Sequence, residues 1–179
     1  ALQAGALLEL FEAGIAPALL VGTSAGALNA GFLATDPTLA GARRLADLWT
    51  NAERDDLFPG GRLGMLRRLA TGQSLFPSEP LRRFVARQIP PERRRFGDLA
   101  GVRLYVTAAN LNLGRLYLYG DDPDASLVDA MVASAAHPLA FPPVRADPWQ
   151  LVDGGVVANV PVGIALEKGA TEVYLLNVG

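Results

Sequence analysis

The sequence contains no cysteine, and this absence excludes several kinds of chemistry at once. Without cysteine there is no disulfide framework, no thiol nucleophile and no thiolate metal ligand. Histidine is nearly absent too, since His137 is the single one among 179 residues. A zinc site built from several histidines is therefore excluded, and we expect neither a metal nor any other cofactor.

The sequence also has little net charge, −2 at pH 7. So small an excess gives no general reason to expect a nucleic acid as partner. Internal repeats and low-complexity tracts are absent, and half of the residues are apolar, which excludes intrinsic disorder. The length fits one domain with a substantial core, so we expect a single domain over residues 1–179. The oligomeric state cannot be predicted from these features.

Residues 13–35 carry no charge and are long enough to cross a bilayer. However, this stretch contains Pro17 and four glycines, and it divides into a short strand and a short helix. A buried strand, turn and helix is therefore the preferred interpretation. The chain opens without the basic region of a signal peptide, and we expect a cytoplasmic or peripheral membrane location.

The spacing of apolar residues predicts strands that alternate with helices. The predicted helices cover residues 1–13, 24–34, 40–50, 62–70, 78–88, 127–136 and 162–168, and the predicted strands cover 17–21, 102–109, 116–119, a short run ending at 153, and 173–178. Short links between strand and helix favour an α/β fold with a mainly parallel central sheet flanked by helices. Within it, residues 40–97 form a helical segment rich in arginine.

The segment from Leu19 to Leu28 carries the strongest chemical signal. An apolar strand runs into Gly22-Thr23-Ser24-Ala25-Gly26, and a helix of small residues follows. A nucleophile elbow needs this context, because its serine sits on a strained turn between strand and helix. Gly22 and Gly26 carry no Cβ atom that would block so sharp a turn. The N–H groups at the start of the helix would stabilise negative charge on a tetrahedral intermediate.

A second segment places a carboxylate beyond the end of a strand, at Asp153-Gly154-Gly155. In α/β sheets catalytic groups lie beyond the carboxyl ends of strands, where Ser24 is also expected. A serine needs a neighbouring base, and Asp153 could act on Ser24 directly. Asp-Gly is also common in hairpin turns, although residues 159–161 do not continue as a second hairpin strand. His137 is the other candidate base, or else a helix C-terminal residue that interacts with the helix dipole.

Four segments together resemble the patatin-like phospholipase family. They are residues 22–30 around Ser24, residues 133–144 with their alanines and prolines, the Asp153-Gly154-Gly155 motif, and Ala158-Asn159-Val160-Pro161. Their order and spacing agree with the family as well. The resemblance implies a three-layer α/β/α fold and a Ser–Asp dyad, with Ser24 as nucleophile and Asp153 as base.

The resemblance further implies an acyl-enzyme intermediate and hydrolysis of acyl ester bonds in membrane lipids. Five residues would support the turns and the oxyanion: Gly22, Ala25, Gly26, Gly154 and Gly155. The family's first strand and glycine-rich oxyanion loop are expected upstream of Ala1. Two other functions stay open, a catalytically inactive patatin-like interaction module and a Ser–His–Asp esterase that uses His137. The head group, the acyl chain and the position cleaved are not predicted.

Arginines are concentrated in the middle of the chain. Nine of the sixteen basic residues lie between residues 60 and 97, against only Glu79 and Glu92. Such a segment forms either an ordinary solvated face or a surface for peripheral contact with an anionic membrane. The sequence leaves both interpretations open.

Overall fold

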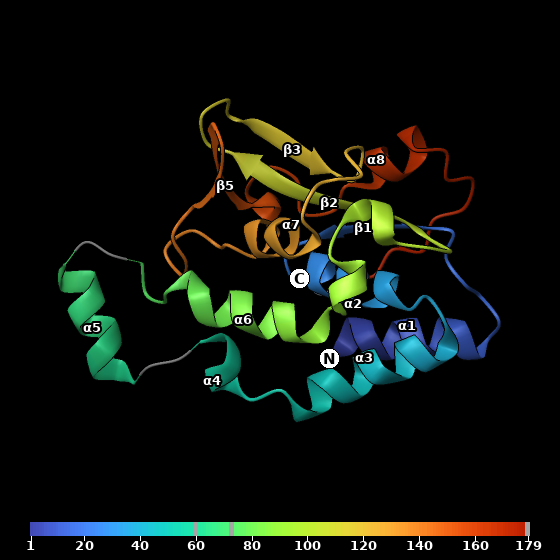
Figure 1. The fold of residues 1–179 in the computed structure, drawn as a ribbon, viewed down its shortest axis with the longest axis horizontal. Helices are drawn as coiled ribbons and strands as arrows, with labels where there is room; N and C mark the ends of the chain where they lie inside the picture. The colour runs from blue at the N-terminus through green and yellow to red at the C-terminus, as the bar shows by residue number, and fades with distance from the viewer. Residues whose placement is uncertain (59–60, 72–73, 178–179) are drawn as a thin grey trace.

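The computed structural model describes residues 1–58, 61–71 and 74–177 (Figure 1). Its α-helices are α1 (Leu2–Glu12), α2 (Ala25–Thr35), α3 (Leu39–Asn51), α4 (Arg54–Leu57), α5 (Arg62–Ala70), α6 (Ser78–Gln88), α7 (Leu127–Ser134) and α8 (Val162–Glu167). Its 3₁₀ helices are η1 (Pro91–Arg93), η2 (Phe96–Asp98) and η3 (Gly154–Val156), and its strands are β1 (Leu19–Thr23), β2 (Arg103–Asn110), β3 (Arg115–Tyr119), β4 (Val144–Ala146) and β5 (Trp149–Asp153). The predicted α/β class, with a central sheet and flanking helices, is confirmed.

Strand β2 is the centre of the sheet. It pairs with β3 along one edge, from Val106 to Asn110. Its other edge is shared, because β1 pairs with the first part of β2 up to Thr107, and β5 pairs with the remainder from Ala108. The carboxyl ends of β1 and β5 therefore meet beside the middle of β2.

The directions of the strands correct the expectation of a mainly parallel sheet. Among the described strands only β1 and β2 run parallel, and the pairs β2–β3, β2–β5 and β4–β5 are antiparallel. The physical reason is that two of these pairs are joined by short turns, at residues 111–114 and 147–148, and a short turn can connect only antiparallel strands.

Helices α2 and α7 pack against the sheet. Helix α2 contacts β1 and β2, and α7 contacts β2 and β5. Figure 1 shows α1, α3 and α6 on the far side of α2 and α7 from the β2–β3 hairpin. The two inner helices approach closely, since a Cβ on Gly31 of α2 would lie 2.3 Å from the sulfur of buried Met131 on α7. Close packing of this kind holds the ends of α2 and α7 in fixed positions.

The prediction of a last strand over residues 173–178 is wrong for the residues of this range that the structure describes. Residues 173–177 lie in no strand, and residue 178 is outside the described residues. A strand needs a hydrogen-bonded neighbour, and a cavity lined by both β1 and this segment separates the two. In the described part of the chain, no helix has both the length and the apolar character needed to cross a bilayer.

Candidate active site

Ser24 occupies the turn between the last residue of β1 and the first residue of α2. Its backbone has φ 56° and ψ −124°, a conformation that non-glycine residues rarely adopt and that stores strain. A Cβ on Gly22 would lie 2.6 Å from both Ala27 Cα and the Gly26 carbonyl oxygen, so the turn requires glycine there. The expectation that the turn also requires glycine at position 26 is wrong, since the nearest atom to a Cβ on Gly26 would be 3.8 Å away.

The structure brings Ser24 and Asp153 together although 129 positions separate them in the chain. Ser24 Oγ donates a hydrogen bond to Asp153 Oδ2 at 2.6 Å. The second carboxylate oxygen, Oδ1, accepts the backbone N–H of Gly155 at 2.8 Å. Asp153 is only 2% exposed, whereas Ser24 is half-buried. The carboxylate is therefore fixed in orientation, and the serine remains accessible from outside.

Gly154 and Gly155 allow the chain to turn away from β5 beside β2. A Cβ on Gly154 would lie 2.5 Å from Thr107 Oγ1 and 2.7 Å from the Thr107 carbonyl oxygen, so only glycine fits. The two glycines begin the 3₁₀ helix η3 and do not form a hairpin turn. The hairpin interpretation of Asp153-Gly154 is therefore wrong.

The amino end of α2 lies next to Ser24 and begins with amide groups that have no acceptor within the helix. The Ser24 carbonyl accepts the N–H groups of Ala27 and Leu28. The amides of Ala25 and Gly26 precede these donors, and the first amides of a helix have no partner within it. They carry the partial positive charge of the helix dipole. Ala25 and Gly26 can thus donate to a developing oxyanion near Ser24.

His137 lies three residues beyond the end of α7, with its side chain exposed. Its Nδ1 atom is 2.7 Å from the Pro138 carbonyl oxygen. The bond from Ser24 to Asp153 is direct, so no imidazole lies between the hydroxyl and the carboxylate. This geometry matches the interpretation of His137 as a residue at the end of a helix.

Two polar residues beside the dyad were not identified from the sequence. Ser134 Oγ accepts the backbone N–H of Ser24 at 2.9 Å, and Thr107 Oγ1 is 2.7 Å from Thr23 Oγ1. Both Ser134 and Thr107 are completely buried. The sequence did contain a signal for both residues, because each is a hydroxyl residue among apolar neighbours, Ser134 at the end of a helix and Thr107 within a strand. A buried hydroxyl group needs a hydrogen-bond partner.

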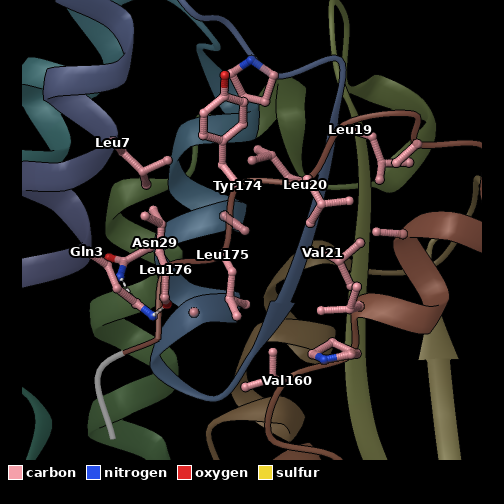
Figure 2. Close-up of a pocket in the computed structure, with 18 of the residues that line it drawn as sticks. Gln3, Leu7, Leu19, Leu20, Val21, Asn29, Val160, Tyr174, Leu175 and Leu176 are labelled. Atoms are coloured by element: carbon pink, nitrogen blue, oxygen red, sulfur yellow. Dashed lines mark hydrogen bonds between the residues drawn. The ribbon is translucent and has the colours of Figure 1, made fainter.

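A cavity of about 640 Å³ adjoins Ser24 on the open side of β1. Its walls come from α1, β1, residues 159–165 and residues 169–177. Figure 2 shows Leu20 and Val21 of β1 on one side and Leu7 of α1 on the other, with Leu175 and Leu176 between them. Within the described residues β1 pairs only with β2, so the other edge of β1 faces this cavity.

A chain of polar groups closes one end of the cavity. Trp49 Nε1 donates to Asn29 Oδ1 at 2.5 Å, Asn29 Nδ2 donates to Gln3 Oε1 at 2.7 Å, and Gln3 Nε2 donates to the Leu176 carbonyl at 2.8 Å. The chain links α3, α2 and α1 to the C-terminal segment. Among the described residues, no cluster of three or more acidic or histidine side chains could hold a metal ion.

The chain is similar to known proteins both in sequence and in fold. A family model described as "Patatin-like phospholipase" matches residues 1–166. The crystal structure of VipD from Legionella pneumophila is similar, with a TM-score of 0.62 and 18% sequence identity. The match covers 89% of this chain and 44% of VipD, so the chain spans less than half of that protein. No curated protein matches the sequence.

Proposed function

Because the chain belongs to the patatin-like phospholipase family, we propose that it hydrolyses acyl ester bonds of lipids with Ser24 as nucleophile and Asp153 as base. The observation that carries the proposal is the 2.6 Å hydrogen bond from Ser24 Oγ to Asp153 Oδ2. A serine hydroxyl becomes a good nucleophile when an adjacent base takes its proton. A buried carboxylate held by the Gly155 amide is placed to do so.

In the first step Ser24 Oγ attacks the ester carbonyl carbon while its proton passes to Asp153. The amides of Ala25 and Gly26 stabilise the resulting oxyanion. Electrostatic stabilisation of this kind is usually the largest single contribution to the rate enhancement of an enzyme. Collapse of the intermediate breaks the bond to the leaving alcohol, which takes the proton from Asp153. An acyl-enzyme on Ser24 remains.

In the second step water attacks the acyl-enzyme and gives its proton to Asp153. The new tetrahedral intermediate releases the fatty acid, and the proton returns to Ser24 Oγ. Both steps use the same base, Asp153, and the same oxyanion donors.

The open edge of β1 supports one further part of the proposal. The family resemblance expects a strand and a glycine-rich loop before Ala1. A strand parallel to β1 along its open edge would place the loop that follows it beside Ser24, because the carboxyl ends of parallel strands share one edge of the sheet. Its N–H groups would add to those of Ala25 and Gly26.

The test of the proposal is labelling and turnover by the full-length protein. A fluorophosphonate probe, which reacts with activated serines, should label Ser24, and fatty acid should be released from a phospholipid. Ser24→Ala should remove the label and lower turnover by about 10³-fold or more. Ser126→Ala, at the start of α7, is the matched control. Labelling that persists in Ser24→Ala would overturn the assignment of the nucleophile.

A further inference from the structure

The end of α7 contacts the backbone of both dyad residues. Ser134 Oγ accepts the N–H of Ser24 at 2.9 Å, and two residues later the Ala136 carbonyl accepts the N–H of Asp153 at 3.0 Å. We infer that Ser134 is a positioning residue, which together with Ala136 sets the distance between Ser24 and Asp153. The inference rests on the proposed role of these two residues in ester hydrolysis.

The N–H of Ser24 needs a partner that regular structure cannot supply. The parallel ladder between β1 and β2 ends one residue earlier, at Thr23. Helix α2 begins one residue later, and a residue at the amino end of a helix has no acceptor within that helix. A polar backbone group left without a partner in a protein interior is costly. Ser134 supplies the acceptor, and it holds the strained backbone of Ser24 in place.

The two contacts come from one short, rigid segment. Ser134 is completely buried, Ala136 is 1% exposed, and the last turns of α7 are buried among core residues. Helix α7 itself packs on β2 and β5 (Figure 1). Since the same segment holds the amide of Ser24 at the end of β1 and the amide of Asp153 at the end of β5, neither dyad residue can shift alone.

A second contact limits how much Ser134 contributes. Thr107 of β2 pairs through its hydroxyl with Thr23 and lies directly against Gly154. This contact stays when Ser134 is altered, so the elbow should loosen and not collapse. Catalysis is sensitive to such loosening, because a displacement of about 1 Å can lower the rate by about 10²-fold.

A purely structural role for Ser134 would have a different consequence. A hydroxyl near the end of a helix contributes to stability through local hydrogen bonds, and its removal would then lower the melting temperature alone. Ser126 at the other end of α7 has such a role, since its Oγ accepts the N–H of Asp129 at 3.2 Å and caps the helix. Ser126→Ala is therefore the matched control for Ser134→Ala.

The experiment compares Ser134→Ala, Ser134→Cys and Ser126→Ala with the wild type in the full-length protein. A cysteine side chain fills the same buried volume as serine, but its sulfur is a weak hydrogen-bond acceptor. Ser134→Cys therefore tests the inference if Ser134→Ala does not fold. We measure the rate constant for fluorophosphonate labelling, kcat and KM on one ester, and the melting temperature.

The expected result is that both Ser134 variants label and turn over about 10- to 100-fold more slowly, with KM unchanged. Ser126→Ala should stay within about twofold of the wild-type rates while its melting temperature falls. A folded Ser134 variant that labels at the wild-type rate overturns the inference. An unlabelled wild type would instead overturn the proposed function, so the two failures are distinguishable.

Discussion

At the scale of single residues, Ser24 is held in a conformation that it would not adopt alone. Its left-handed φ of 56° costs on the order of 1–3 kcal/mol. Hydrogen bonds from its N–H to Ser134 and from its hydroxyl to Asp153 offset this cost. This strained conformation places the hydroxyl at the tip of the turn, where an ester can reach it.

The first residue-scale prediction concerns the base. Asp153→Asn keeps the size of the side chain but removes the proton acceptor, so turnover should fall by about 10³-fold or more. The side chain should still fit its buried site, and the melting temperature should change little. Parallel assays of turnover and thermal unfolding check both statements. An active Asp153→Asn protein would show that another group takes the serine proton.

His137 provides the contrast to Asp153. Its side chain is exposed and bonds to the adjacent Pro138 carbonyl, so His137→Ala should retain most of the activity. The same turnover assay measures this variant. If His137→Ala, correctly folded, loses as much activity as Ser24→Ala, a Ser–His–Asp mechanism replaces the proposed dyad.

At the scale of secondary-structure elements, the elbow depends on how closely β1 approaches α2. A Cβ on Gly22 would lie 2.6 Å from backbone atoms of residues 26 and 27, and backbone atoms cannot move without changing the turn. The position of Ser24 therefore follows from the packing of a strand against the helix that comes after it.

The corresponding prediction compares two glycines of one motif. Gly22→Ala should destabilise the protein by about 3 kcal/mol through overpacking, which lowers the melting temperature on the order of 10 °C. Gly26→Ala has room for its methyl group and should leave the melting temperature equal or slightly higher, because alanine favours helix. Thermal unfolding of both variants measures the difference. Equal losses would mean that the elbow is not tightly packed.

At the scale of the whole molecule, the arginine-rich segment is partly engaged in internal contacts. Arg82 forms an ion pair with Asp129, and Arg68 Nε donates to the Ser74 carbonyl. The apolar residues between these arginines are expected to pack inward, and Leu81 and Phe84 are indeed buried. The side chains of Arg62, Leu63, Leu66 and Leu69 lie outside the described residues. The exposed arginines Arg67, Arg83 and Arg87 remain candidates for contact with lipid.

We therefore predict that the protein binds anionic vesicles more strongly than zwitterionic ones, and that salt weakens this binding. Charges on the surface are screened over about 8 Å at physiological ionic strength. Cosedimentation at low and high salt measures the effect. Replacing Arg83 and Arg87 by glutamine should reduce binding, whereas Arg115→Gln, an exposed arginine on β3, should not. Equal binding to both vesicle types would leave these arginines as an ordinary solvated face.

Features of this protein that depend on neighbours along the chain could be predicted from the amino-acid pattern. An apolar run, a tight glycine turn and a following helix predict the elbow at Ser24, and an apolar run before Asp153 predicts the strand that ends there. Helix α7 follows from its apolar residues, which predict a helix over residues 127–136. Each of these features is decided within a few residues, which is why pattern and local conformation agree.

Contacts between groups that are distant in the sequence are set by the packing of separate segments in the folded chain. The sharing of one edge of β2 by β1 and β5 brings Ser24 and Asp153 together across 129 positions, and it places Ser134 beneath the elbow. The antiparallel direction of β5 and the absence of a strand over residues 173–177 were missed for the same reason. Strand pairing is a contact between separate segments, so an apolar run shows that a strand is favoured but not which neighbour it pairs with or in which direction.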